Sequence, residues 1–178
     1  ATGNSYKGQQ GAGFVSIISQ SISVTASDAS DQLASDARRL GLEVGGESAT
    51  DLAAPGTGLY APSDSKGFSQ VGGTSFAAPL VSGAIVLLQQ VYQSRFNALP
   101  SVDDVDAWLK KASKPIKDPA SGITIGRLDV PKAIGLIPVP AAQELKPPAP
   151  VVVAPVPAPV VVAPAPAPVA IVAPVLAP

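Results

Sequence analysis

The sequence contains no histidine, and this absence restricts its chemistry more than any other feature. Histidine is the commonest general base and metal ligand in proteins, so a site built by this chain alone has neither. Cysteine is absent too, which excludes disulfides and thiolate metal sites. The formal net charge is −1 and no large basic run occurs, so we expect no nucleic-acid partner. Every apolar stretch of about eighteen residues is interrupted or contains proline, so we expect no membrane-spanning helix.

Proline divides the chain into two regions. Residues 1–137 hold 7 prolines, residues 138–178 hold 13, and the last charged residue is Lys146. Short Pro-Ala-Val units cannot sustain a helix or an interior strand, and they favour extended polyproline II. We therefore predict a folded region over 1–137 and a disordered Pro/Ala/Val-rich tail over 138–178, suited to binding proline-recognising domains or spanning a cell wall.

Hydrophobic periodicity in residues 1–137 predicts an α/β layered domain. Residues 26–50 and 57–73 are polar or glycine-rich and are predicted as loops. A helix apolar nearly all round is predicted from Ser75 to about Arg95; such a helix is normally buried, and Pro79 suits only its first turn. The other expected elements are one or two strands in 14–25, a strand at 51–56, an amphipathic helix at 101–113 capped by Ser101 and Asp104, a strand at 123–130 and a helical turn at 131–134.

The segment Gly73–Pro79, with the sequence Gly-Thr-Ser-Phe-Ala-Ala-Pro, is the most informative motif. It predicts a tight glycine turn that delivers Ser75 to the start of a helix. This placement exposes the hydroxyl and directs backbone N–H groups at a developing oxyanion. In isolation, Ser75 would more often be an ordinary helix N-cap than a nucleophile.

The motif resembles the nucleophile segment of the subtilisin-like serine proteases. Ser75 matches the nucleophile of that family, and Leu80 stands where many members have histidine. Ala1–Asn4 resembles the segment whose asparagine donates to the oxyanion, and it precedes Ser75 by 71 residues, close to the spacing of the family. Three further segments match in order, at residues 15–18, 51–56 and 126–130.

The resemblance implies the later half of a subtilisin-like domain, a parallel sheet with flanking helices. It implies that Ser75 and Asn4 are catalytic, that Gly3 and Thr74 bind substrate, and that polypeptides are the substrates. No cofactor is required for this chemistry. Most members are secreted, so we expect an extracellular or cell-envelope parent protein. The aspartate and histidine of the family lie upstream of the matched asparagine, so we expect that the beginning of the chain is missing or was removed by processing.

Two alternatives remain open. The chain could be a non-catalytic pseudoprotease remnant that acts as a binding or wall-spanning module. It could also resemble the sedolisin-type serine-carboxyl proteases, which use carboxylates in place of histidine; Asn4 favours the subtilisin side, because sedolisins use aspartate for the oxyanion.

Several other residues have a functional and a structural interpretation. Asp51 and Trp108 are better explained by structural roles than as a triad acid and a ligand platform. The acidic residues of the 26–50 loop leave a structural calcium site open, although a solvated loop is the simpler interpretation; they are Asp28, Asp31, Asp36 and Glu43.

Overall fold

The computed structural model describes residues 1–8, 11–40, 49–63 and 67–140. The elements in chain order are the 3-10 helix η1 (Phe14–Ile17), strands β1 (Val24–Ser27), β2 (Leu52–Pro55), β3 (Leu59–Ser63) and β4 (Gly67–Val71), helices α1 (Thr74–Phe96) and α2 (Val102–Ala112), strands β5 (Lys114–Lys117) and β6 (Thr124–Arg127), and helix α3 (Val130–Gly135). The predicted tail lies almost wholly outside the described residues, so its disorder stays a prediction.

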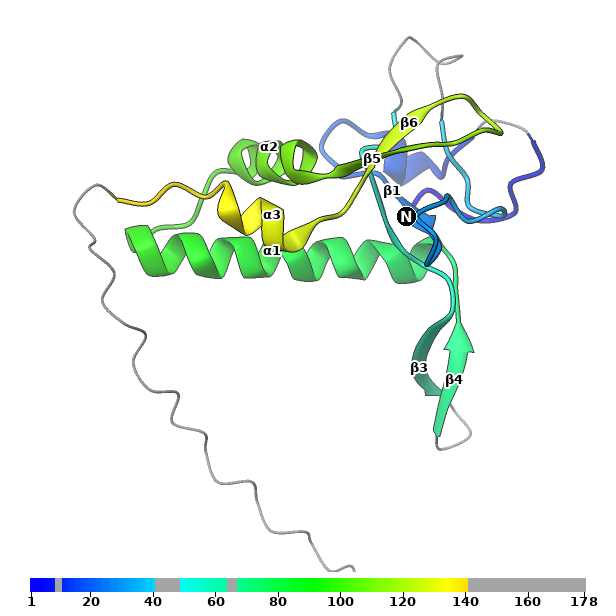
Figure 1. Cartoon of the computed structure of the whole chain (residues 1–178), viewed down its shortest axis with the longest axis horizontal. Coiled ribbons are helices and arrows are strands. Elements are labelled where there is room, and N and C mark those ends of the chain that lie inside the picture. Colours follow the sequence, from blue (N-terminus) through cyan, green and yellow to red (C-terminus); the bar gives the residue numbers. More distant parts are fainter. Residues whose placement is uncertain (9–10, 41–48, 64–66, 141–178) are drawn as a thin grey trace, which may run out of the picture. The chain divides into compact units, whose positions relative to one another are not determined.

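A four-stranded sheet in the order β1-β2-β6-β5 is the centre of the fold. Strands β1, β2 and β6 are parallel, and β5 pairs with β6 in the antiparallel direction. Leu52 and Ala54 of β2 belong to the core that the sheet forms with α1, α2 and α3, whereas Ala53 belongs to a smaller core with Ile116 and Ile125. The helices therefore flank one face of the sheet, and the predicted α/β class with a parallel sheet is confirmed (Figure 1).

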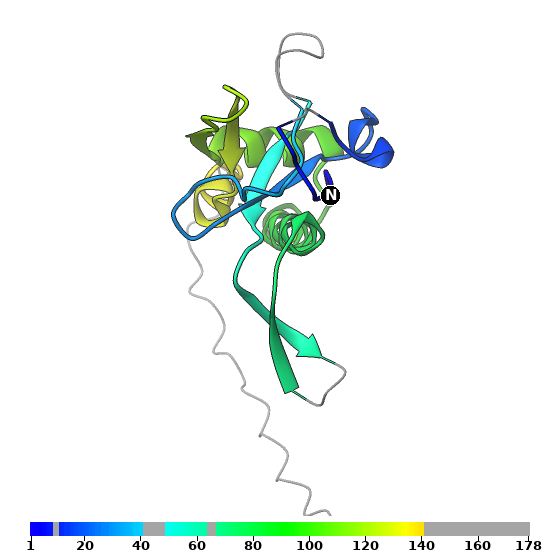
Figure 2. The same ribbon diagram turned by 90° about the vertical axis from the view of Figure 1, so that its right-hand side faces the viewer.

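Strands β3 and β4 form a separate two-stranded hairpin, which extends away from the amino-terminal end of α1 (Figures 1 and 2). The prediction of a loop over residues 57–73 is therefore wrong. Tyr60 and Phe68, which share one face, are each 74% exposed, and no residue on either face of the two strands is buried, so the hairpin lacks the buried side of an ordinary strand pair. Without a buried face the sequence shows no clean alternation, which is why the pattern failed to predict these strands.

The strand predicted across residues 14–25 is only partly correct. β1 begins at Val24, but Phe14–Ile17 is a 3-10 helix with Phe14 78% exposed. The Ser16 hydroxyl donates to the Gly13 carbonyl at 2.7 Å, and the Ser16 N–H donates to the same oxygen at 2.9 Å. Such local serine bonds compete with strand pairing, and here they prevail over β propensity.

Helix α1 exists as predicted, but it is buried along one side only. Ala77, Val81, Ala84 and Leu88 are buried, while Val86 is 60% exposed. The prediction of a helix that is buried on every side is therefore wrong, because the side that carries Val86 is exposed. By length and composition α1 also meets the requirements for a membrane-spanning helix, as the core helices of soluble proteins often do, and its buried side packs on β1 and β2.

Helix α2 begins as predicted. The Ser101 hydroxyl accepts the Asp104 N–H at 3.1 Å, which is an N-cap, and donates to the Asp104 carboxylate at 2.7 Å; in a full capping box that carboxylate would accept the Ser101 N–H instead. Strand β5 was not predicted, because Ile116 is its single buried side chain and lysines occupy both ends.

Candidate active site

A glycine turn places Ser75 at the start of α1. The chain leaves β2 through Gly56, forms the hairpin and returns through Gly73, whose N–H donates to the Gly56 carbonyl at 2.6 Å. A Cβ atom on Gly56 would lie 2.5 Å from the Cβ of Ala26, so no larger residue fits there. The hairpin is thus closed at its base immediately before the helix begins.

Ser75 is the second residue of α1, and its side chain is exposed. Within the described part of the chain, no hydrogen bond engages its hydroxyl or its N–H. Pro79 lies inside the helix, one turn later than predicted, so the Ser75 carbonyl lacks its usual i+4 donor. The hydroxyl and the N–H of Ser75 therefore have no partner among the described residues.

Thr74 holds Asn4 beside this turn. The side-chain Oδ1 of Asn4 accepts the Thr74 N–H at 3.0 Å and the Thr74 hydroxyl at 3.2 Å. An N–H group can only donate, so the Asn4 atom that faces it must be the oxygen. The Asn4 Nδ2 consequently lies on the other side of the amide, against Gly73, and presents donors.

Gly73 leaves the space that this amide occupies. Its φ is +123°, and a Cβ there would lie 2.7 Å from Asn4 Nδ2. The Thr74 hydroxyl also accepts the Gly3 N–H at 3.0 Å, so it is engaged by both residues of the facing loop. We call Gly3, Asn4, Gly73, Thr74 and Ser75 the nucleophile corner.

The structure thus brings together the four residues predicted for the site, across 71 positions of sequence. Ser75 and Asn4 are exposed, Gly3 is half-buried, and Thr74 is fully buried. Thr74 acts on the site through Asn4 and Gly3, a role that the motif alone did not reveal.

Arg38 fixes the loop that carries Asn4. Its N–H donates to the Gly3 carbonyl at 2.7 Å and its Nε donates to the Asn4 carbonyl at 2.9 Å. Both backbone carbonyls next to the Asn4 amide are therefore anchored, which limits how far this side chain can move.

The adjoining Arg39 forms a buried ion pair that sequence reasoning missed. Its Nε lies 2.9 Å from Oδ2 of Asp118, its guanidinium lies over the ring of Tyr6, and Ser121 also donates to Asp118. Burial alone would raise the pKa of Asp118, but the hydrogen bonds from Arg39 and Ser121 outweigh it and lower that pKa. Nothing in the local sequence distinguishes Arg39 from a solvated arginine.

The acidic residues considered for calcium do not converge. The Asp28 carboxylate accepts two backbone N–H groups of its own loop, and Asp31 pairs with Lys114 and Arg127. The hydrogen bond from Lys114 lowers the pKa of Asp31. Glu43 lies outside the described residues, and the described ones include no group of three or more potential metal ligands.

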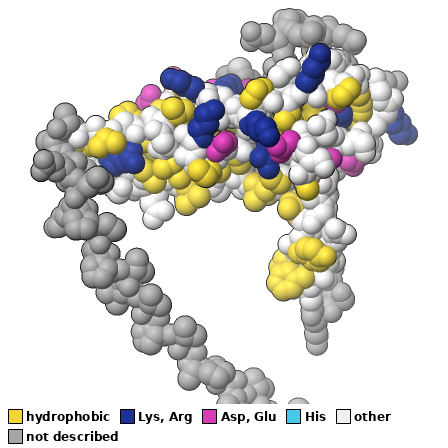
Figure 3. Space-filling model, viewed as in Figure 1, with side chains coloured by type: hydrophobic (Ala, Val, Ile, Leu, Met, Phe, Trp, Pro, Cys, Tyr) yellow, Lys and Arg dark blue, Asp and Glu magenta, His cyan; other side chains and the backbone are white. Residues whose placement is uncertain are grey.

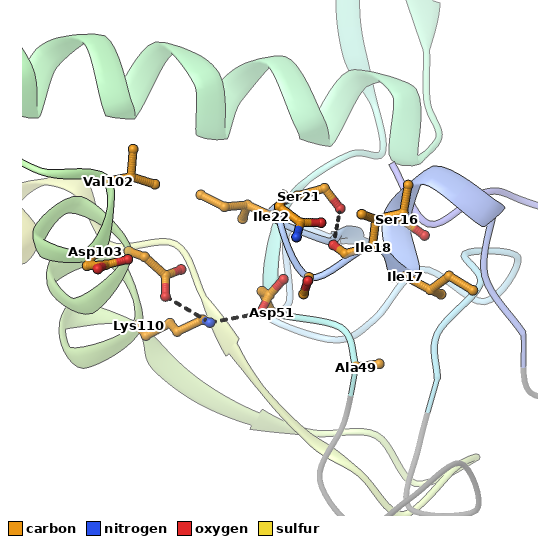
Figure 4. Close-up of a pocket in the computed structure, with 13 residues that line it drawn as sticks. Ser16, Ile17, Ile18, Ser21, Ile22, Ala49, Asp51, Val102, Asp103 and Lys110 are labelled. Atoms are coloured by element: carbon orange, nitrogen blue, oxygen red, sulfur yellow. Dashed lines mark hydrogen bonds and ion pairs between the residues drawn. The ribbon is translucent and has the colours of Figure 1, made fainter.

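Asp51 lines a cavity of about 640 Å³ that the nucleophile corner does not touch (Figure 4). The Lys110 ammonium lies 2.8 Å from Asp51 and 3.0 Å from Asp106. Partial burial lowers the pKa of Lys110, but the two carboxylates outweigh it, so the pKa is raised. Asp51 also accepts the Ser23 N–H at 2.7 Å, which supports a structural role.

A glycine turn thus brings a serine at the start of a helix close to a facing asparagine. Residues 1–128 match the Subtilase family (Peptidase_S8), and the chain belongs to this family. No curated protein sequence matches the chain.

Several solved proteases have a similar fold. The prenylagaramide maturation protease PagA is 24% identical, with a TM-score of 0.64 over 77% of this chain and 49% of its own. The patellamide maturation protease PatA is 24% identical, with a TM-score of 0.57 over 69% and 45%. The self-cleaved protease domain of PatA is 24% identical, with a TM-score of 0.62 over 76% and 48%. The chain therefore spans about half the length of these structures.

Proposed function

We propose that this chain is the nucleophile-bearing half of a serine endopeptidase domain. In the complete domain the Ser75 hydroxyl attacks a peptide carbonyl, and the Asn4 Nδ2 and the Ser75 N–H stabilise the oxyanion. The observation that carries this proposal is the orientation of the Asn4 amide, whose oxygen is engaged by Thr74 while its nitrogen lies against Gly73, two residues before the exposed Ser75.

The reaction needs a base that this chain does not supply. A serine hydroxyl is almost wholly protonated near neutral pH, so an adjacent base must accept its proton as the bond to carbon forms. The sequence has no histidine. A histidine, oriented by an aspartate, must come from protein outside these 178 residues, as in other Ser-His-Asp enzymes.

The substrates of this activity are extended polypeptides. The Gly3 backbone beside Asn4 suits an approaching peptide, and the reaction requires no cofactor. The parent protein would be exported, with the proline-rich tail contacting the cell wall or a proline-recognising domain.

Active-site labelling tests the proposal. The complete domain, with the missing half joined to Ala1, should cleave casein and react with a fluorophosphonate probe at Ser75. The 178-residue chain alone should do neither, because no base lies beside its nucleophile. Ser75→Ala in the complete domain should abolish both signals.

Two results would contradict this function. One is casein cleavage that persists in the complete Ser75→Ala domain. The other is strong labelling of Ser75 in the isolated chain, which would reveal a base among its own residues. A complete domain that folds but neither cleaves nor labels would instead support the pseudoprotease alternative.

A further inference from the structure

Arg38 carries a guanidinium group that the fold uses only in part. Its Nε donates to the Asn4 carbonyl at 2.9 Å, but within the described residues neither terminal nitrogen donates a hydrogen bond. Arg39, the next residue, is buried and donates through all three of its nitrogens, to Asp118 and to backbone carbonyls. Arg38 is exposed, so its two terminal nitrogens can take a partner from outside the fold.

No described carboxylate forms an ion pair with Arg38, although other surface cations have such partners. Lys114 and Arg127 both contact Asp31, at 2.6 and 2.8 Å. Figure 3 shows basic side chains lying against acidic ones across the middle of one face of the molecule. The charge of Arg38 is uncompensated by comparison, which favours an anionic ligand there.

Arg38 lies against a residue that is predicted to bind substrate. A Cβ on Gly3 would lie 3.4 Å from the Cδ of Arg38, and a Cβ on Gly11 would lie 3.9 Å from its Nη1. Glycine at both positions leaves these approaches to the arginine without a covering side chain. If Asn4 holds the oxygen of the attacked carbonyl, the nearest substrate side chain is the one borne by the carbon atom next to that carbonyl.

The position of Arg38 is fixed before any ligand binds. Its N–H donates to the Gly3 carbonyl at 2.7 Å, and its own carbonyl accepts the hydroxyls of Thr2 and Thr25 at 2.6 and 2.9 Å. Both threonines are fully buried. With Nε also engaged, the guanidinium has little freedom to lose on binding. Such a fork can hold a carboxylate through two parallel N–H···O bonds.

We propose that Arg38 is a specificity-determining residue, which gives the protease a preference for aspartate or glutamate at the substrate position that supplies the attacked carbonyl. The inference rests on the proposed function for the place of the substrate. It adds the chemistry of the side chain that the substrate carries at this position.

A pair of peptides tests the preference. The two extended peptides differ only in having glutamate or glutamine at this position, and the complete domain cleaves each while kcat/KM is measured. The glutamate peptide should be preferred at least about tenfold, because hydrogen bonds between two charged groups are stronger than those with a neutral amide. Equal cleavage of the two peptides would overturn the proposal.

Variants of Arg38 separate specificity from positioning. Arg38→Gln should bring the ratio of the two kcat/KM values to about one, because no charge remains to favour the carboxylate. Arg38→Glu should instead favour a lysine peptide. Loss of the bond to the Asn4 carbonyl would slow cleavage of both peptides alike, so it would leave the ratio unchanged. A ratio that survives Arg38→Gln would overturn the proposal.

Lys7→Gln is the matched control. It removes another exposed cation from the segment that follows Asn4, and it should change the ratio less than about twofold. A fall in the ratio as large as that caused by Arg38→Gln would show that the preference reflects the general charge of this surface, and would refute a specific role for Arg38.

Binding distinguishes this inference from the proposed function. In the complete Ser75→Ala domain, calorimetry should show at least about tenfold tighter binding of the glutamate peptide, and Arg38→Gln should remove the difference. The same binding difference in an unmodified domain that cleaves neither peptide would refute the proposed function and support the Arg38 site. Cleavage of both peptides with no difference in either assay would refute the Arg38 site alone.

Discussion

The nucleophile corner and the Arg39–Asp118 ion pair are both built from polar groups, but they differ in what remains unpaired. Arg39 and Asp118 are almost fully buried, and their charges meet each other, Ser121 and nearby carbonyls. In the corner, Thr74 is equally buried and paired, yet it leaves the Asn4 Nδ2 and the Ser75 hydroxyl exposed.

This contrast separates a stabilising cluster from a reactive one. A buried charge without its partner is costly, so the ion pair contributes mainly to keeping the fold intact. The exposed donors of the corner cost little when unpaired, because water satisfies them, and they remain ready for a substrate. Changes in the two clusters should therefore affect different measurements.

Asp118→Ala should have the largest effect on stability. It leaves the Arg39 guanidinium buried without a counter-ion, which typically costs about 3–5 kcal/mol. Urea unfolding of the complete domain measures the loss. Asp36→Ala, which removes an exposed carboxylate from the same loop region, is the control and should cost less than about 0.5 kcal/mol. A loss that small for Asp118→Ala would mean that the ion pair is not a stabilising cluster.

Asn4→Ala should reduce the turnover of the complete domain by about 10²–10³, a range established on a subtilisin oxyanion donor, and should also cost about 1–3 kcal/mol of stability because the buried Thr74 loses its acceptor. Asn4→Asp gives the sharper comparison. The carboxylate can still accept from Thr74, but it offers no donor to the oxyanion. Turnover should therefore fall although the corner stays anchored, with KM changing much less than kcat. Unchanged turnover in either folded variant would remove Asn4 from the mechanism.

Acid should weaken the ion pair before it changes the hydrogen bonds of the corner. The pKa of Asp118 is lower in the folded protein than its ordinary value of 3.8, so its stabilisation is complete above that value and is lost as the pH falls through the folded pKa. Unfolding free energies measured between about pH 5 and 2 should decrease more steeply in the parent than in Asp118→Asn. Parallel profiles would show that Asp118 does not carry this dependence.

Lys110→Met should have the smallest effect. Its ammonium contacts two carboxylates, but the side chain is 46% exposed, and such pairs contribute about 0–1 kcal/mol. Salt titration of the unfolding midpoint checks this, because screening should reduce the difference between the two proteins. A loss comparable to that of Asp118→Ala would require a functional interpretation of the cavity in Figure 4.

The sequence predicted those parts of the fold whose signals are local. The N-cap of α2, the start of α1 and the short strand β2 follow from Ser101, the Gly73 turn and Pro55, each readable within a few residues. The sequence did not predict which sides of α1 and of the hairpin are covered, because burial depends on partners distant in the chain.

The site shows the same division. Ser75 and Asn4 were predicted by resemblance, and their proximity agrees with the structure. The amide orientation set by Thr74 was not predictable, because it depends on one hydrogen bond between loops 70 residues apart. Arg39 was missed for the same reason, since its partner Asp118 is 79 residues away.

The bond between the Gly73 N–H and the Gly56 carbonyl makes the hairpin a side branch of the chain. This hydrogen bond closes the base of the hairpin before the chain reaches Ser75. The lengths of β3 and β4 therefore do not determine where Ser75 lies. Strands β3 and β4 can therefore lengthen or shorten during divergence without moving Ser75. In protein engineering, the same branch is a natural graft point for a reporter or a targeting peptide.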